Sequence, residues 1–533
     1  MKKISSSIIL IALTVFAFAQ QQSKPNILFI AIDDLKPILG CYGDKLIKTP
    51  NIDRLAKMGT VFMKNYCQQA VCGPTRASLM TGKRPDYTKV WDLKTPMRDV
   101  NPDILSLPQY LITQGYSTQG IGKVYDPRNV DDDLDKPSWS VPYYETDKKY
   151  YAPAFGEPAL KMYQLPETKK LVAQYLKEAN EKGMTKSEAR LYVSEKIKPS
   201  VESADVPDNA YNDGANVLQA QDILVELSKA NKPFFFAVGI AKPHLPFVAP
   251  KKYWDLYKRE EMPVAEYQEK SKNSVDIAYH NAGEIRAYSD IPPLISFTDQ
   301  KEFGLTLPIS KQKELIHGYH AAVSYTDALV GKLLKTLDSL GLTKNTIIVL
   351  WGDHGWHLGD HNLWCKHTNF EQATHAPLII AVPGMKPGVT NSITEHLDIF
   401  PTLCELADVK IPVVLDGKSL VPIIKNPLKS IQSFAVSQYP RSGMKSETER
   451  QGYASSKYMG YSFRNERYRY TVWMGDNFRS NQPFKQSLVV GTELYDYTKD
   501  PLEKVNVAED KSYAPISKSM YNQMLEFFKS QVK

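Results

Sequence analysis

Four short runs in this sequence are apolar at consecutive positions rather than at alternate ones. They are residues 26–32, 233–238, 346–351 and 377–382. A strand with one face in water alternates apolar and polar residues, so continuous apolar runs indicate strands that are buried on both faces. Apolar residues recur at helical spacing between these runs, for example over 216–229 and 316–340. Strands that alternate with helices predict an α/β fold, in which helices cover both faces of a sheet.

The rest of the chain divides into regions of different character. Residues 127–210 and 255–312 are charged and contain few strand signals, so we expect insertions of helices and loops there. Beyond residue 425 strand patterns return, notably over 458–473, and a helical pattern closes the chain. The 533 residues are enough for more than one domain. We predict a large domain over residues 20–425 and a smaller α+β domain over 426–533.

The amino terminus has the pattern of a secretory signal peptide. Lys2 and Lys3 precede an apolar run over 8–18, and Ala17-Phe18-Ala19 supplies a small-x-small cleavage site. We therefore predict removal of residues 1–19 and export to the periplasm or the medium. The alternative is a membrane anchor, but this run falls short of the ~20 residues that a membrane span needs. No later stretch is long and uncharged enough to span, and a net charge of +7 is too dilute to indicate a nucleic-acid partner.

Charged and imidazole side chains follow three of the buried runs. Asp33 and Asp34 follow the first, His244 follows the second, and Asp353 with His354 follows the third. The carboxyl ends of parallel strands meet at one edge of a sheet, so these side chains are expected to converge there. Neighbouring carboxylates repel each other unless a cation joins them. The three aspartates are therefore candidate metal ligands; a helix cap or a solvated turn is the alternative for the Asp-Asp pair alone.

Five of the ten histidines lie between residues 354 and 375. His357 and His361 are four residues apart, which allows a zinc site if they share a helix face. Gly355 and Gly359 argue against such a helix, because glycine disfavours a helix interior. We retain this zinc site only as an alternative.

The most specific motif is Cys72-Gly-Pro-Thr-Arg76, followed by Thr81-Gly82. Five cysteines are too few for a disulfide framework, and their odd number leaves at least one to explain. Cys72 is either a buried loop residue or a nucleophilic thiol, although no histidine stands nearby in sequence to activate it. The other four cysteines allow up to two disulfides after export.

The motif at Cys72 resembles the signature of the formylglycine-dependent sulfatases. The similarity extends over nearly the whole mature chain and is greatest to the iduronate-2-sulfatase branch. The stretches that carry it include residues 68–76, 82–86, 122–124, 242–247, 353–356, 373–375, 459–462 and 468–473. The resemblance implies an alkaline-phosphatase-like fold with a large mixed sheet and a smaller carboxyl-terminal domain, with the large domain catalytic. It also implies hydrolysis of sulfate monoesters on sulfated oligosaccharides or polysaccharides.

The same resemblance implies a cofactor and a metal ion. Cys72 is expected to become formylglycine (3-oxoalanine) through a formylglycine-generating or an anaerobic maturase enzyme. A calcium ion is expected to bind Asp33, Asp34, Asp353 and His354 together with the modified Cys72. Calcium prefers oxygen ligands, so His354 is the weakest of these and has an alternative role as a hydrogen-bond partner of the nucleophile.

The resemblance further implies the roles of the remaining site residues. Arg76 matches the arginine that steadies the aldehyde hydrate. Lys123 and Lys366 match sulfate-binding lysines, and His244 matches the histidine near the leaving oxygen. The hydrate of residue 72 is expected to attack sulfur, form a sulfo-enzyme intermediate and then expel sulfate.

One departure from the family pattern stands after Lys123. The family has a histidine two or three positions later, where this chain has Tyr125 and Asp126. Asp126 is an alternative base, but its negative charge beside a sulfate opposes binding. The rival functions are a phosphoester hydrolase of the same fold and a non-catalytic binder of sulfated glycans.

The sugar is the least constrained part of the prediction. The resemblance implies a 2-O-sulfated uronic acid at a chain end, and algal polysaccharides such as ulvan are the alternative. Arg464, Arg467 and Arg469 are candidates for contacting a sugar carboxylate, although a solvated strand face is the favoured interpretation for each of them.

Overall fold

A computed structural model describes the chain in seven segments. They are residues 24–230, 232–280, 282–292, 307–412, 415–441, 457–475 and 488–531. The predicted signal peptide over residues 1–19 lies outside the described residues, as do residues 293–306 of the second predicted insertion.

A seven-stranded sheet forms the centre of the molecule, in the order β11-β2-β10-β7-β1-β5-β3. Its strands in chain order are β1 (Asn26–Ile32), β2 (Thr60–Tyr66), β3 (Ser117–Gly122), β5 (Phe234–Ile240), β7 (Thr346–Gly352), β10 (Leu378–Ala381) and β11 (Gly388–Glu395). β1 pairs in parallel with both β5 and β7, whereas β10 is antiparallel to β7 and β2. All four predicted strands are present, and the sheet is mixed as expected.

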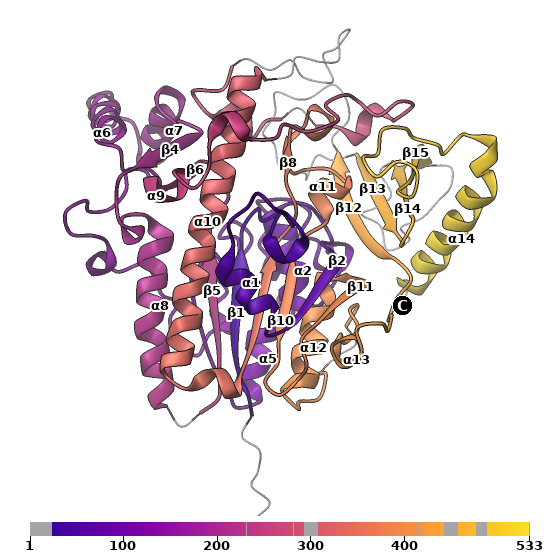
Figure 1. Ribbon diagram of the computed structural model, residues 1–533, viewed down its shortest axis with the longest axis horizontal. Coiled ribbons are helices and arrows are strands. Elements are labelled where there is room, and N and C mark those ends of the chain that lie inside the picture. Colours follow the sequence, from indigo (N-terminus) through magenta and orange to yellow (C-terminus); the bar gives the residue numbers. More distant parts are fainter. Residues whose placement is uncertain are drawn as a thin grey trace, which may run out of the picture.

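Helices cover both faces of this sheet (Figure 1). Alternate residues of β1 belong to two separate cores: Leu28 and Ile30 to one, Ile27 and Phe29 to the other. The first core includes residues of α1 (Pro50–Ala56), α8 (Asn212–Lys229) and α10 (Ile309–Ser339). The second includes residues of α2 (Cys72–Thr81), α5 (Leu107–Thr113), α12 (Ile399–Leu406) and α13 (Val421–Lys425). Burial on both faces explains why the strand sequences do not alternate.

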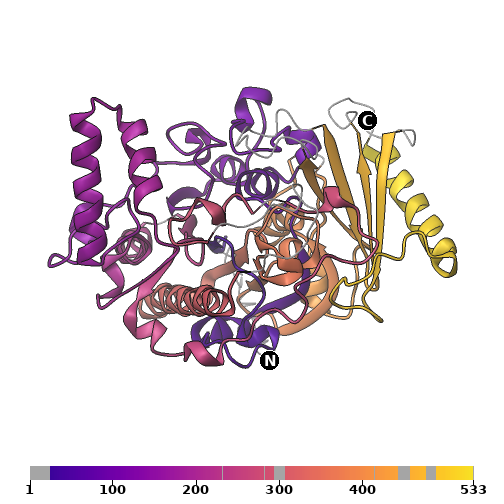
Figure 2. The same ribbon diagram turned by 90° about the horizontal axis from the view of Figure 1, so that it is seen from above.

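The first predicted insertion consists mostly of helices and loops. It contains α6 (Pro166–Glu181) and α7 (Lys186–Lys196), which lie at one end of the molecule in Figure 2. It also contains a short strand that the sequence did not indicate, β4 (Val201–Ala204), which pairs with β6 (Phe247–Pro250). This pairing fixes the chain directly after His244, so the insertion supports one side of the strand-end region.

Short elements connect the larger ones. They are α3 (Pro85–Thr88), α4 (Met97–Val100), α9 (Lys251–Trp254), α11 (Glu371–Thr374), β8 (His357–Leu358) and β9 (Trp364–Cys365). The described part of the second predicted insertion contains only 3₁₀ turns before α10 begins.

A second, four-stranded antiparallel sheet follows near the carboxyl end. Its order is β12 (Ala435–Arg441), β13 (Tyr458–Arg464), β14 (Tyr468–Met474) and β15 (Val489–Asp496). The closing helix α14 (Ala514–Gln531) buries Met520, Met524 and Phe528 in the core of this sheet. The α+β character agrees with the expectation for this region, while the domain boundary at residue 425 stays a prediction.

A buried ion-pair cluster joins the two sheets. Arg464 and Arg469 bond to Glu371 of α11 over 2.9 and 2.5 Å, and Arg469 also pairs with Glu503 over 3.0 Å. Arg464 is 6% exposed and Arg469 is 1% exposed. The prediction of a solvated strand face is therefore wrong for both arginines, because their charges are neutralised inside the protein rather than by water. Arg467 pairs with Asp496 over 2.7 Å.

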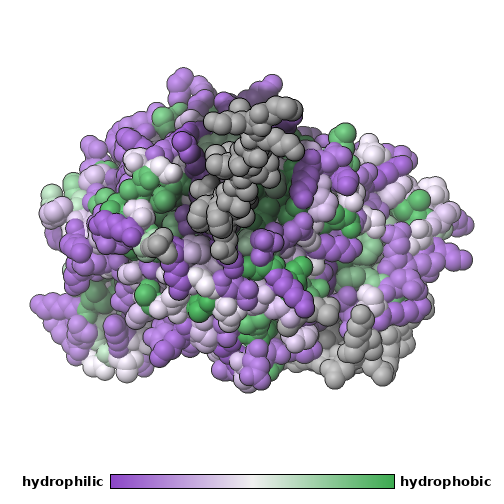
Figure 3. Space-filling view, turned by 90° about the horizontal axis from the view of Figure 1, so that it is seen from below, coloured by the Kyte–Doolittle hydropathy of each residue, from purple (hydrophilic) through white to green (hydrophobic). Residues whose placement is uncertain are grey.

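The surface is mainly hydrophilic. In Figure 3 polar side chains predominate on the visible face, and hydrophobic ones occur in small scattered groups. Within the described segments, no helix combines the length and the apolar composition that a membrane crossing requires.

The buried Glu493 carboxyl makes a measurable contribution to the pH dependence of stability. Burial raises its pKa to about 7, although the Trp473 indole and the Tyr495 hydroxyl donate hydrogen bonds to it over 3.0 and 2.8 Å. Because the unfolded group titrates near 4.5, stability falls as the pH rises from about 4.5 through 7. We expect Glu493→Gln to remove up to about 3 kcal/mol of this loss.

The measurement is the thermal unfolding midpoint of both proteins at pH 5 and pH 8. The unfolding midpoint of the variant should exceed that of the wild type at pH 8 but not at pH 5. The control is Glu526→Gln, at an exposed position of α14. Its effect on the unfolding midpoint should be the same at pH 5 and pH 8. An equal effect of Glu493→Gln at both pH values would contradict the assignment.

Candidate active site

Residues from six elements converge at the carboxyl ends of the parallel strands. Asp33 and Asp34 follow β1, Asp353 and His354 follow β7, and the neighbouring loops supply the rest of the site. Those loop residues are Lys123 after β3, His244 after β5, Lys366 after β9, and Cys72 with Arg76 in the first turns of α2. The structure thus brings together every residue that the sequence assigned to the site, because β1 lies between β5 and β7.

Arg76 ties these strand ends together from inside the protein. Its Nε donates to Asp353 Oδ2 over 3.0 Å and its Nη2 donates to Asp33 Oδ1 over 2.9 Å. Its Nη1 donates to the main-chain carbonyl of Val124 over 2.9 Å. All three charged side chains are fully buried. Burial lowers the pKa of Arg76, but the two aspartates outweigh it and hold the guanidinium charged.

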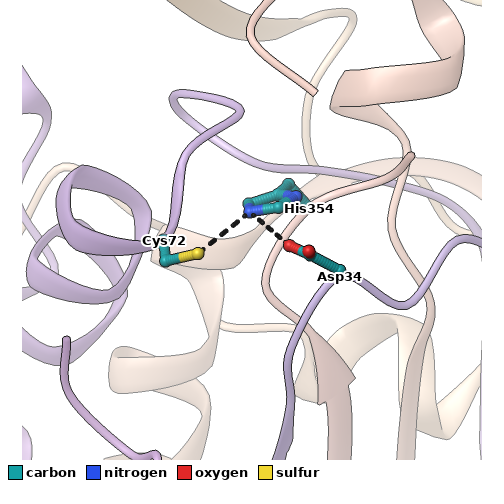
Figure 4. A group of neighbouring side chains, drawn as sticks. All are labelled: Asp34, Cys72 and His354. Atoms are coloured by element: carbon teal, nitrogen blue, oxygen red, sulfur yellow. Dashed lines mark hydrogen bonds and ion pairs between the residues drawn. The ribbon is translucent and has the colours of Figure 1, made fainter. Parts of the chain in front are cut away.

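The side chain of Cys72 faces His354 and Lys123. Cys72 Sγ lies 3.5 Å from His354 Nε2 and 3.7 Å from Lys123 Nζ. The same His354 nitrogen lies 3.4 Å from Asp34 Oδ1, so the imidazole stands between residue 72 and the carboxylate (Figure 4). Burial raises the pKa of the Cys72 thiol well above its usual value. An unmodified thiol here is protonated and therefore a poor nucleophile.

Asp34 has a raised pKa and a left-handed backbone conformation. Lys366 Nζ donates to its two oxygens over 2.9 and 3.1 Å, and its own main-chain N–H donates to Asp353 Oδ1 over 2.9 Å. Burial, together with the charge of the neighbouring Asp33, nevertheless raises the pKa of Asp34 to about 7. Its backbone is left-handed, with a φ of 58°. Such strain is typical of functional sites.

These carboxylates have the geometry of a cation site. Ligand atoms of Asp34, Cys72 and His354 lie within 4.8 Å of one another, as do those of Asp33, Cys72 and Asp353. The donor set is dominated by carboxylate oxygens, which suits a hard divalent cation such as calcium. A cation here would also stabilise the buried charge of Asp34. The residues present therefore fit a calcium ion.

A fourth carboxylate, Glu284, completes the site and was missed from the sequence. Its Oε1 lies 2.9 Å from Lys366 Nζ and 3.2 Å from His244 Nε2, and its Oε2 lies 2.9 Å from His367 Nε2. The backbone is left-handed on both sides of Lys366, at Cys365 and His367. Glu284 lies in the second predicted insertion, where no motif distinguishes it from other acidic residues.

Asp126, the alternative base, is engaged elsewhere. Arg128 donates to both of its carboxylate oxygens, from Nε over 2.8 Å and from Nη2 over 2.7 Å. Burial raises the pKa of Asp126, but Arg128 and Lys123 outweigh it and lower the value to about 2. The structure therefore argues against Asp126 as a proton acceptor near neutral pH, because it is already paired and ionised.

The zinc alternative is not supported. Among the described residues, the groups that approach metal-ligand spacing contain neither His357 nor His361. His357 Nε2 bonds to the Thr368 hydroxyl over 2.9 Å, and His361 stacks on Phe370. All five cysteines are free thiols, so the possible disulfides are not formed.

The mixed sheet, with its carboxylate-lined site at the strand ends, is an alkaline-phosphatase-like α/β fold. The same fold is seen in a phosphonate monoester hydrolase of Agrobacterium radiobacter, with a TM-score of 0.66, 24% identity and 96% coverage of both chains. It is also seen in a structure of BT4656 in complex with its substrate D-glucosamine-2-N,6-O-disulfate, with a TM-score of 0.68 and 20% identity over 96% of this chain and 98% of that one.

Sequence comparison identifies the family within this fold class. The profile of the sulfatase family matches residues 25–409, and that of the N-sulphoglucosamine sulphohydrolase carboxyl-terminal domain matches residues 359–530. The chain belongs to the sulfatase family and is a sulfate ester hydrolase. It is 33% identical to human iduronate 2-sulfatase over 91% of each chain. It is 27% identical to an ulvan-active sulfatase of Formosa agariphila, over 76% of this chain and 66% of the relative. Sulfatases generally use a formylglycine and a divalent metal ion.

Proposed function

We propose that this protein is an exported sulfatase that removes sulfate monoesters from sulfated glycans, with residue 72 acting as a formylglycine. The observation that carries the proposal is the placement of Cys72. Its buried side chain lies within hydrogen-bonding reach of Lys123 and His354, in a Cys-x-Pro-Thr-Arg segment whose arginine binds two of the metal-ligand candidates. The amino-terminal sequence supports export, and the likeness to iduronate 2-sulfatase supports a 2-O-sulfated uronic acid as the substrate unit.

Three cations prepare the site for a sulfate monoester, which carries a negative charge. Lys123 bonds to Asp33 and lies 3.7 Å from Cys72 Sγ, and Lys366 bonds to Asp34, so both ammonium groups are already oriented by the carboxylates of the site. Arg76 lies beneath them and holds Asp33 and Asp353 in place. Preorganised cations stabilise the charge that develops on the sulfate oxygens at no cost in reorganisation.

Asp33, Asp34 and Asp353 would hold the calcium ion, and His354 would act instead as the hydrogen-bond partner of residue 72. When bound, calcium supplies a Lewis acid that polarises an oxygen ligand. A hydrated aldehyde at residue 72 would supply two hydroxyl groups on one carbon, one as the nucleophile and one for the release of sulfate. A buried thiol or a single hydroxyl provides no equivalent of the second group.

His354 is the residue positioned to handle the proton at residue 72. Its Nδ1 lies 2.9 Å from the carbonyl oxygen of Gly355, to which it donates, which leaves Nε2 directed at the end of the residue 72 side chain. Asp126 is excluded from this role by its pair with Arg128. Of the described residues, His354 therefore best takes the place of the histidine that the chain lacks after Lys123.

His244 is placed to protonate the departing sugar oxygen. Its side chain is 26% exposed and opens onto the site, in contrast to the fully buried His354. Its Nδ1 donates to the carbonyl of Leu245 over 2.5 Å, so the second proton of the imidazolium sits on Nε2, which faces Glu284. Glu284 positions this nitrogen and Lys366 together, and both point toward the same reacting group.

This role of His244 predicts an effect that depends on the leaving group. A sugar alkoxide needs a proton as it departs, whereas a nitrophenolate does not. His244→Asn should therefore lower kcat/KM on a sugar sulfate by about 10²-fold or more, and much less on 4-nitrophenyl sulfate. Equal losses on the two substrates would show that His244 does not donate this proton.

The direct test of the function compares three readouts on one purified protein, produced together with a maturase. Inorganic sulfate release is measured from a panel of defined oligosaccharides, including 2-O-sulfated uronate and ulvan fragments. Phosphate release from matched phosphate esters and binding without turnover are measured in parallel. The proposal expects sulfate release to dominate. Faster phosphate release would support the phosphoester hydrolase, and tight binding with no product would support a non-catalytic binder.

The two glycan classes are separated by the same panel. The ulvan-active relative from Formosa agariphila is the observation that keeps algal oligosaccharides as the second candidate substrate. A preference for ulvan fragments over heparin-type or dermatan-type fragments would decide for it.

A further inference from the structure

A tight turn after Lys123 packs directly against the residue that follows Cys72. The main-chain N–H of Asn129 donates to the carbonyl of Asp126 over 3.0 Å and closes the turn. The Asn129 side chain is buried and bonds to two main-chain carbonyls over 2.8 and 2.9 Å. Its Oδ1 lies only 1.7 Å from where a Cβ of Gly73 would stand. A side chain at Gly73 would collide with the turn, so the turn is fixed beside the nucleophile.

This turn holds an arginine in a defined orientation. The side chain of Asp126 is fully buried, and its two oxygens accept hydrogen bonds from Nε and Nη2 of Arg128. A bidentate pair of this kind fixes the plane of the guanidinium. The side chain of Arg128 remains 52% exposed, so the positive end of the pair faces solvent. Among the described residues, nothing accepts a hydrogen bond from its Nη1.

Arg128 also lies within the electrostatic reach of the reacting centre. Burial lowers its pKa, but the bond to Asp126 outweighs this effect, and the charge of Asp33 raises the pKa further. The geometry of the turn at Gly73 leads to the same placement.

The other arginines differ from Arg128 in their place: Arg467, which is also exposed, is paired with Asp496 of the second sheet. Arg76 is buried beneath the site, and Arg464 and Arg469 are buried in the cluster around Glu371. Arg128 combines a fixed plane, an open edge and a place in the turn that packs against Gly73, the residue after Cys72. An open guanidinium edge of fixed orientation matches a planar or tetrahedral oxyanion.

We propose that Arg128 binds a second anionic group on the sulfated sugar, a carboxylate or another sulfate, and so selects substrates that carry two anionic groups. This inference rests on the proposed function. Because Asp126 orients Arg128 before binding, little side-chain freedom is lost when the second anion arrives. The residues found where the family has a histidine would then serve substrate selection rather than proton transfer.

The test uses two matched pairs of substrates with the same scissile sulfate. One pair is a 2-O-sulfated uronate glycoside and its carboxyl-reduced analogue. The other is a disulfated hexose glycoside and its monosulfated analogue. The readout is the ratio of kcat/KM within each pair, so a general loss of activity or of folded protein cancels. The variants are Arg128→Gln, Arg128→Lys and, as a matched control, Lys136→Gln, an exposed lysine of the same insertion.

The proposal expects the wild type to prefer the doubly anionic member of at least one pair by about 10- to 100-fold, as a charge-assisted bond provides. Arg128→Gln should bring this ratio close to one, chiefly through KM, and Arg128→Lys should restore part of it. Lys136→Gln should leave the ratio unchanged. The pair that responds identifies the carboxylate or the sulfate as the ligand.

Two results would overturn the inference. One is a wild-type ratio near one in both pairs, and the other is a ratio that survives Arg128→Gln. Failure of the proposed function itself looks different, because the wild type would then release no sulfate from any member of either pair.

Discussion

Replacing Cys72 with alanine should lower sulfate release by at least about 10⁴-fold, since it removes the group on which every other part of the site converges. The side chain is 1% exposed and lies between Lys123 and His354. The loss should appear in kcat, while binding of a sulfated sugar persists, because Lys123 and Lys366 remain. The measurement is inorganic sulfate released per enzyme over time.

The matched control for this variant is Cys404→Ala. Cys404 is also a buried free thiol, but it packs in the second core of the large sheet with Leu403 and Ala407. It should retain turnover at a level close to that of the wild type. A Cys72→Ala protein that is folded by circular dichroism and releases sulfate at a rate close to the wild type would refute the role of residue 72.

Replacing Arg76 with methionine should have the largest effect on stability, about 3–5 kcal/mol in a buffer that contains a chelator. The reason is that Asp33 and Asp353 are both fully buried and would lose their shared counter-ion. Removing one member of a buried ion pair leaves uncompensated charge, which costs far more than the pair itself contributes. The measurement is the shift of the thermal or urea unfolding midpoint relative to the wild type.

Arg54→Met is the control for Arg76→Met. Arg54 pairs with Asp338 at the surface, where the two side chains are 45% and 40% exposed. Its loss should cost no more than about 1 kcal/mol. Added calcium should rescue Arg76→Met more than it stabilises the wild type, because a divalent cation compensates the same carboxylates. Equal stability losses for the two variants would contradict the account of the buried network.

Much of this architecture follows from local sequence. The four continuous apolar runs predict buried strands, because a strand covered on both faces has apolar residues at successive positions rather than at alternate ones. Asp33, Asp353 and His244 converge because the ends of β1, β7 and β5 are adjacent in a parallel arrangement. The motif at Cys72 is recognisable because its specific spacing lies within one short segment, residues 72–82.

The features that escaped prediction depend on contacts between distant segments. Glu284 joins the site from an insertion, and nothing in its local sequence shows that it will meet Lys366, which lies 82 residues away. Arg464 and Arg469 were expected on a solvated face, yet they pair with Glu371 of helix α11, which is distant in sequence. The sequence around Asp126 and Arg128 shows only that the histidine of the family is absent. That the two side chains pair, and that the neighbouring Asn129 contacts Gly73, depends on the folded structure.

The central claim is that residue 72 of the active enzyme is an aldehyde rather than a thiol. Trypsin cleaves after Lys64 and Arg76, so one peptide contains both Cys67 and Cys72. The active protein is denatured, treated with a thiol-alkylating reagent and digested, and this peptide is weighed by mass spectrometry. We expect one alkyl group in this peptide, on Cys67, and an aldehyde at residue 72 that reacts with a hydrazide. Two alkyl groups in the peptide from fully active enzyme would contradict it.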